Sequence, residues 1–246
     1  VVAELGDLKS EASEPACATT LAEGEEPEPI DPVLPGEETT VYIGENGEFA
    51  SYYSPIYDYY SKYAITQQIY TAEEIGIASG EITSIAFKSK SGGGYDRNIS
   101  VYLSNTDKEY YTGGMDWVVL TEADAAVFEG TVTTPTNGEW LTIELTTPFE
   151  YTGGNLAVTI NDKTGSYGAY AQFIQWEAYS TGKSETSPRA LYKTNYNSEI
   201  AYTGLATIYG TLDAHNYAGW GETPDNEYIN SKVKFTIIPS ASNEIG

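Results

Sequence analysis

The sequence contains very little cysteine and histidine, and this scarcity removes whole classes of active site. Among 246 residues there is one cysteine, Cys17, and one histidine, His215. A single cysteine allows neither an intramolecular disulfide nor a thiolate metal site. His215 stands in LDAHNYAGWG, and no G-x-S-x-G element supplies a serine nucleophile, so a surface loop position is favoured over a catalytic one. We therefore predict that the protein is not an enzyme.

Basic residues are scarce as well. Lys and Arg total 12 against 36 Asp and Glu, which gives a formal net charge of −24. Phosphate binding needs clustered cations, so nucleic acid is excluded as a partner. No apolar run approaches the roughly 20 residues of a spanning helix, so membrane insertion is not expected. The acidity suits an extracellular protein, and carboxylates are the groups that Ca²⁺ prefers, although solubility alone also explains the charge.

Residues 1–38 have the composition of a tail. They hold eleven acidic residues and one lysine, and the stretch EGEEPEPIDPVLPGEE is rich in proline. Proline removes backbone donors and favours extended polyproline II, while like charges repel one another. We predict an acidic, proline-rich tail or linker over 1–38. If it docks on a neighbouring copy by strand addition, its apolar residues are the anchors: Val1, Val2, Leu5, Leu8, Ile30, Val33 and Leu34.

The composition changes at residue 39, where short runs of Val, Ile, Thr, Tyr and Phe begin to alternate with clusters of Gly, Asn, Asp and Ser. This pattern predicts an all-β, two-sheet antiparallel sandwich (jelly roll) over 39–246. Alternation of period 2 assigns these side chains to its core: Ile85, Phe87, Val101, Leu103, Leu141, Ile143 and Leu145. We expect strands at 39–43, 64–70, 82–89, 98–104, 117–121, 126–133, 139–146, 155–161, 169–176, 189–193 and 231–238.

Two other segments stand out in the body. One short helix is predicted at 71–76, because Thr71 can cap it, Glu74 follows three residues later and Gly76 can end it. Residues 194–230 alternate weakly and are predicted as long loops with one or two strands, and long loops often carry binding sites.

Tyrosine is unusually frequent, with 22 Tyr beside 4 Trp. Flat amphipathic rings suit sugars or partner proteins. Six tyrosines fall in YYSPIYDYYSKY at 52–63, which we expect to pack along the edge of the sandwich. Trp117 and Trp140 lead into apolar alternating runs and are expected in the core. The candidates for an exposed ligand-binding surface are Trp176, Tyr179 and Trp220.

Four aspartates lie at strand ends or in turns, where ligands for a structural Ca²⁺ can converge. Each is also a natural turn former through side-chain hydrogen bonds, and the sequence has no EF-hand loop. The candidate metal ligands are Asp107, Asp116, Asp124 and Asp162.

The order of segments over 52–170 resembles a known family. YSKYAITQQIYTAEEIG, GEITSIAF, RNISVYLSNTDK, DWVVLTEAD, VFEGTVT and GEWLTIELTTPFEYTGGNLAVTINDKTGSY follow one another. The series resembles the jelly-roll surface repeats of type IX-secreted proteins, akin to the cleaved-adhesin domains of gingipain haemagglutinin regions. The resemblance implies a β-sandwich with an adhesive or carbohydrate-binding role, bound Ca²⁺ and no catalytic residues.

These features predict an extracellular, cell-surface, adhesin-like domain that binds a glycan or a protein of a host or neighbouring cell. Two alternatives stay open. One is a structural subunit of a surface filament, a homopolymer joined through residues 1–38. The other is an accessory domain of a secreted glycoside-active or proteolytic enzyme, because a carboxylate pair cannot be recognised among so many acidic residues.

Overall fold

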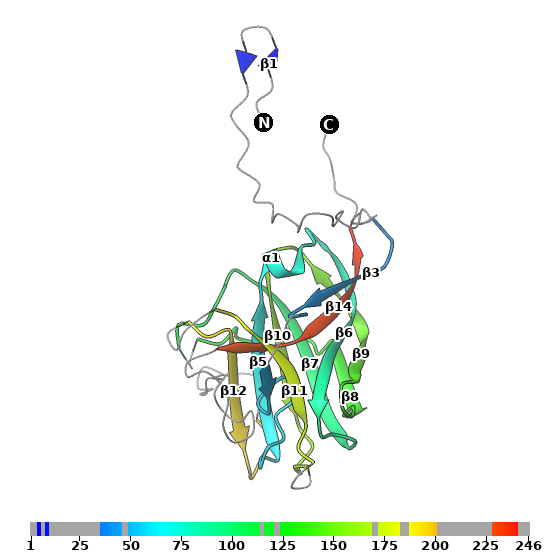
Figure 1. The fold of residues 1–246 in the computed structure, drawn as a ribbon, viewed down its shortest axis with the longest axis vertical. Helices are drawn as coiled ribbons and strands as arrows, with labels where there is room; N and C mark the ends of the chain where they lie inside the picture. The colour runs from blue at the N-terminus through cyan, green and yellow to red at the C-terminus, as the bar shows by residue number, and fades with distance from the viewer. Residues whose placement is uncertain are drawn as a thin grey trace, which may run out of the picture. The chain divides into compact units, whose positions relative to one another are not determined.

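The computed structural model describes residues 35–45, 49–113, 116–120, 124–168, 172–182, 187–200 and 228–240, and two short strands nearer the N-terminus (Figure 1). Contacts divide the chain into two units, Val1–Pro32 and Val33–Gly246. In the first unit β1 (Glu4–Leu5) pairs antiparallel with β2 (Leu8–Lys9). The sequence predicted no strand in this tail. The proposed anchors other than Leu5 and Leu8 lie outside the described residues.

The second unit is built almost entirely of strands. They are β3 (Thr39–Ile43), β4 (Phe49–Ser51), β5 (Tyr63–Tyr70), β6 (Gly80–Ser91), β7 (Asp96–Thr106), β8 (Phe128–Thr133), β9 (Trp140–Tyr151), β10 (Asn155–Asp162), β11 (Gln175–Ser180), β12 (Ala190–Asn195), β13 (Ile229–Ser231) and β14 (Val233–Pro239). A five-stranded sheet has the order β12-β5-β10-β7-β8. A seven-stranded sheet has the order β13-β11-β6-β14-β3, with β4 beside β11 and β9 beside β6.

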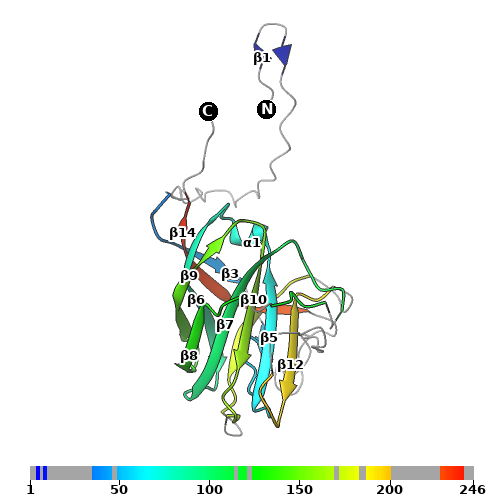
Figure 2. The ribbon, with the colours of Figure 1, turned by 180° about the vertical axis from the view of Figure 1, so that it is seen from behind.

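The two antiparallel sheets pack face to face, so the predicted sandwich is confirmed (Figures 1 and 2). The five-stranded sheet is seen across its width in Figure 2. Alternate residues of facing strands fill the space between the sheets, as period 2 requires. Ile85 stands opposite Phe235 on one side and Ile143 on the other, and all three are buried. The predicted core residues are buried, except that Leu145 is only partly buried where it packs against this cluster.

The outer face of the five-stranded sheet is also covered. Trp117 and Tyr111 pack there against Ile65, Ile69 and their neighbours. Residues 116–120 do so without strand pairing, which corrects the strand predicted at 117–121. The segment is held by side-chain bonds instead, because Gln67 Nε2 donates to the Val118 carbonyl at 2.9 Å and Gln67 Oε1 accepts from the Val118 amide at 2.7 Å.

Most other predicted strands appear within a few residues of their expected ends. Of the strand predicted at 169–176, residues 169–171 lie outside the described residues, 172–174 form no strand, and β11 begins at Gln175. Strand β4, of three residues, was not predicted. Strand β13 lies at the end of 194–230, where one or two strands were predicted, and residues 201–227 of that segment lie outside the described residues. Trp140 is half-buried, at the edge rather than inside the core. Both short strands pair with β11, so their positions depend on long-range pairing that local patterning does not define.

The predicted helix is confirmed as α1 (Ala72–Ile75). The Thr71 side chain accepts from the Glu74 amide, the Glu74 side chain accepts from the Thr71 amide, and Gly76 ends the helix at φ 67°. Glycine suits this left-handed position because it has no Cβ. Within the described residues, no helix is long and apolar enough to cross a membrane.

Replacing Ile85 by alanine should lower the free energy of unfolding by about 2–5 kcal/mol, because it leaves a cavity between the sheets. Thr142→Ala is the matched control, since Thr142 is exposed on the neighbouring β9, and it should change stability by less than about 0.5 kcal/mol. Urea denaturation measures both. Equal effects would contradict the assigned core.

Candidate functional site

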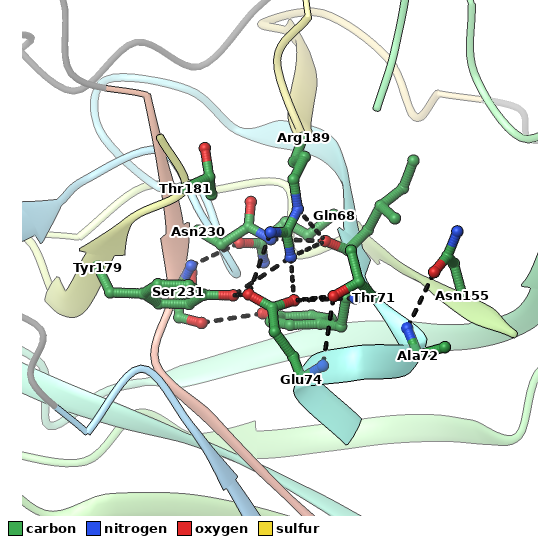
Figure 3. Close-up of polar contacts among 12 residues, drawn as sticks. Gln68, Thr71, Ala72, Glu74, Asn155, Tyr179, Thr181, Arg189, Asn230 and Ser231 are labelled. Atoms are coloured by element: carbon green, nitrogen blue, oxygen red, sulfur yellow. Dashed lines mark hydrogen bonds and ion pairs between the residues drawn. The ribbon is translucent and has the colours of Figure 1, made fainter. Parts of the chain in front are cut away.

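A network of charged and polar side chains surrounds Arg189 beside α1 (Figure 3). Arg189 Nη1 donates to Glu74 Oε1 at 3.0 Å, and Nη2 pairs with Glu74 Oε2. Arg189 Nε and Nη2 also donate to the Ile69 carbonyl at 3.0 and 2.9 Å. Tyr179 Oη donates to Glu74 Oε1 at 2.9 Å. Because Tyr179 lies on β11 and Arg189 just before β12, Glu74 links the two sheets. We call Glu74, Tyr179 and Arg189 the polar clamp.

The electrostatics of the clamp favour the ionised pair. Burial raises the pKa of Glu74, but the hydrogen bonds and charge of Arg189, with bonds from Thr71 and Tyr179, outweigh it and leave that pKa lowered. The carboxylate therefore stabilises the fold above the pKa of the unfolded chain, and that contribution is lost as pH falls through the lower folded pKa.

A cleft of about 440 Å³ opens beside the clamp. Two of its polar groups are already engaged, since Arg189 is paired and Asn155 Oδ1 accepts from the Ala72 amide at 2.9 Å. The clamp stabilises this end of the sandwich, and Glu73 and Glu109 add two further carboxylates to the cleft lining. The cleft is lined by Thr71, Ala72, Glu73, Glu74, Glu109, Asn155 and Arg189.

The aromatic candidates from the sequence do not form one surface. Trp176 is 0% exposed, its Nε1 donates to the Ile56 carbonyl at 3.2 Å, and its ring packs against Phe87. The expectation that it is exposed is therefore wrong, because β11 directs the side chain between the sheets. Tyr179 is partly buried in the polar clamp. Trp220 and His215 lie outside the described residues.

The four aspartates are not gathered either. Asp162 pairs with Ile99 across the sheet while Asn155 pairs with Thr106, so Asp162 and Asp107 lie at opposite ends of β7, roughly 25 Å apart at the usual strand rise. Asp162 Oδ2 accepts from Arg97 Nε at 2.7 Å, and its Oδ1 accepts from the Thr164 amide at 2.9 Å.

The other two aspartates add no metal cluster. Asp116 pairs with Lys108 and accepts from the Thr112 amide and hydroxyl, as a turn former does. Asp124 precedes β8. In the part of the chain that the structure describes, no three His, Cys, Asp or Glu side chains are grouped to hold a metal ion. Structural Ca²⁺ stays a prediction.

The tyrosine-rich run 52–63 is mostly packed, as expected. Tyr53 and Tyr57 are buried, and the centroid of each ring lies 5.3 Å from the centroid of the Tyr192 ring. Tyr60 differs, because 48% of it is exposed. It joins Tyr167, 40% exposed, and Tyr196, 51% exposed.

These three residues, which we call the tyrosine platform, come from three loops at one end of the five-stranded sheet. Tyr60 lies before β5, Tyr167 after β10 and Tyr196 after β12, and the register pairs Ala64 with Asp162 and Tyr63 with Asn195. This is the end opposite α1, the lower one in Figure 1.

Ring contacts run continuously through the platform. The Tyr60 and Tyr167 ring centroids are 6.2 Å apart, and those of Tyr167 and Tyr196 are 6.3 Å apart. The ring of Phe173, which is buried, packs against the ring of Tyr60, with the two centroids 4.9 Å apart. Lys62 Nζ lies 4.3 Å from the Tyr196 ring centroid, a cation–π distance. The result is an amphipathic surface with one cation at its side.

Tyr60 also has a strained backbone. Its φ is 53°, in the left-handed region that favours glycine. A bulky residue held there costs on the order of 1–3 kcal/mol, and such positions cluster at binding and catalytic sites. A weak signal for the platform is present in the sequence, because in DYYSK, GSYGA and TNYNS each tyrosine stands among turn-forming residues.

A buried carboxyl lies beneath the platform. Asp58 is 0% exposed, its Oδ2 accepts from Tyr95 Oη, and Tyr95 Oη accepts from the Ile174 amide at 2.9 Å. Burial raises the pKa of Asp58 to about 6, although the Tyr95 hydrogen bond and the charge of Arg97 act to lower it.

No family model matches this chain, and the comparison with curated proteins finds no match either. The resemblance to surface adhesin repeats therefore stays a prediction, and the function is argued from geometry.

Arg189→Met should lower the free energy of unfolding by about 3 kcal/mol or more, because it leaves the Glu74 carboxylate and the Ile69 carbonyl without their partner. The control is Lys163→Met, whose partner Glu129 has a side chain that is 64% exposed. That pair should contribute less than about 1 kcal/mol. Chemical denaturation at pH 7 measures both, and similar losses would show that the clamp is an ordinary surface pair.

Bound Ca²⁺ is expected to stabilise the fold without serving chemistry. At 100 times its Kd it would raise the free energy of unfolding by about 2.7 kcal/mol. Melting temperatures in a chelator and in millimolar Ca²⁺ provide the measurement. Equal values would overturn the prediction.

Proposed function

We propose that this protein is an extracellular, cell-surface binding domain of the adhesin type, which recognises a glycan through the tyrosine platform. The observation that carries the proposal is the grouping of three tyrosines, each about half exposed, from three different loops. Loops at one end of a rigid sandwich are a common place for recognition. Exposed aromatic clusters of this kind mark interaction sites more often than isolated exposed residues do.

The chemistry of the platform favours a sugar. Tyrosine rings offer apolar faces for the C–H face of a pyranose, and their hydroxyls bond to the ring substituents. Because the chain carries a net charge of −24, it repels polyanions over long range. A neutral glycan is therefore favoured over an acidic one. Lys62 at the edge adds a donor for sugar hydroxyls.

Of the alternatives, only the filament requires another part of the chain. The filament reading depends on residues 1–38 and stays a prediction, which imaging of the full chain and of a chain lacking these residues would test. The accessory-domain reading does not conflict with a glycan site, because a binding module attached to an enzyme uses the same chemistry. A protein partner is the competing occupant of the platform.

Replacing Tyr60 or Tyr167 by alanine should weaken binding of a neutral polysaccharide roughly thirtyfold. Truncating a central aromatic anchor costs about 2 kcal/mol or more, and 1.4 kcal/mol is tenfold in Kd. Calorimetric titration with soluble mannan, glucan and galactan at pH 5.5 gives the affinities.

Tyr110→Ala is the matched control, because Tyr110 is 38% exposed and follows β7 at the other end of the sandwich. It should bind like the parent chain. Equal weakening by Tyr110→Ala and Tyr60→Ala, or no binding of any neutral polysaccharide, would overturn the glycan proposal.

A further inference from the structure

Three connections join the Asp58 carboxyl to the tyrosine platform. Along the chain, Asp58 is two residues from Tyr60. Through Tyr95, whose hydroxyl bonds to both Asp58 and the Ile174 amide, it is linked to the residue after Phe173, which supports Tyr60. The third connection is the loop that carries Tyr167, because the residue after Tyr167 lies next to the Asp58 carboxyl.

That next residue is Gly168. A Cβ built there would lie 2.9 Å from Asp58 Oδ2 and 2.8 Å from the Tyr95 hydroxyl. The loop backbone therefore packs directly against the Asp58–Tyr95 pair. Two of the three platform loops meet at this one carboxyl, and the segment 172–174 that supports them meets it as well.

The charges around Asp58 do not balance when it is ionised. Arg97 is the nearby cation, but it pairs with Asp162, and both side chains are 1% exposed. Asp58 Oδ1 is buried and has no hydrogen-bond partner within the described residues. Two carboxylates then share one guanidinium, and one buried oxygen lacks a donor. An unpaired buried charge is strongly unfavourable.

We propose that Asp58 is the proton switch of the tyrosine platform: the protonated carboxyl keeps the platform loops closed over it, and its ionisation releases them toward water. This inference rests on the proposed function, because it concerns regulation of the same site. The closed platform binds the glycan, so binding is tighter at acidic pH than at neutral pH.

The direction of the pH dependence follows from the difference between the Asp58 pKa in the closed and the open state. A carboxyl with a pKa of about 6 when closed and the ordinary 3.8 when exposed favours closure most below pH 3.8. That advantage is lost as pH rises through 6. Between pH 7 and pH 5 the closing equilibrium therefore strengthens about tenfold.

The other titratable groups that face Asp58 are tyrosines and Asp162. Burial raises the pKa of Tyr52, Tyr57 and Tyr95, so these hydroxyls stay neutral between pH 5 and pH 7. Burial also raises the pKa of Asp162, against the opposing charge of Arg97. A variant at Asp58 itself is needed to assign the titration, and Asp58→Asn imitates the neutral carboxyl in nearly the same shape.

Amide hydrogen exchange tests the switch without any ligand. In the parent chain the protection factor of the Ile174 amide should rise about tenfold from pH 7 to pH 5, and it should stay below the protection of the β14 amides, as local opening requires. In Asp58→Asn it should be high and independent of pH. Asp116→Asn, at the other end of β7, should respond like the parent. An unchanged protection factor in the parent, or exchange of Ile174 only with global unfolding, would overturn the switch.

Calorimetric titration with the same mannan, glucan and galactan at pH 5 and pH 7 tests the coupling. The parent chain should bind more tightly at pH 5, and Asp58→Asn should bind with one affinity at both values. If protection changes with pH while affinity does not, the regulatory proposal is wrong although the carboxyl titrates. If no polysaccharide binds, the glycan proposal fails, while hydrogen exchange still decides whether Asp58 controls the loops.

Discussion

The apolar layer between the two sheets is the constraint on which the rest of the structure depends. A single cysteine leaves the sheets without a covalent cross-link, so burial of alternating side chains has to hold them together. Strand β6 is central to this layer because it pairs with β9 on one side and with β14 and β11 on the other.

Buried polar groups show where the apolar layer is interrupted. Gln68 Oε1 accepts from the Ser231 amide at 2.7 Å, and Tyr70 Oη donates to the Ser231 carbonyl at 3.0 Å, which joins the sheets directly. The polar clamp adds Glu74 and Arg189 at the same end. Such groups fix the relative position of the sheets, because each requires a partner at one distance and angle. Apolar packing alone tolerates small shifts.

The sequence predicted what depends on local pattern. The alternation around Ile85 and Ile143 identified the core, and Thr71 with Glu74 identified the capped helix. It failed where a side chain's surroundings come from distant segments. Trp176 was expected at the surface, yet β4, β6 and β13 enclose its strand, and none of these pairings can be inferred from the residues next to it. The tyrosine platform was missed for the same reason: its members are more than 25 residues apart and meet only because the start of β5 lies beside the ends of β10 and β12.

The two ends of the sandwich hold a carboxyl in opposite electrostatic surroundings. Glu74 receives bonds from Arg189, Tyr179 and Thr71, so its charge is matched and its pKa falls. Asp58 receives a bond from Tyr95, but its Oδ1 has no hydrogen-bond partner within the described residues, and burial raises its pKa. Unbalanced groups of this kind reduce stability, and proteins keep them mainly where a change of state is useful. The strained backbone of Tyr60 lies at the same end. Strain and unmatched charge therefore coincide where the exposed aromatic rings gather, which is why we propose recognition at this end and not at the well-paired clamp beside α1.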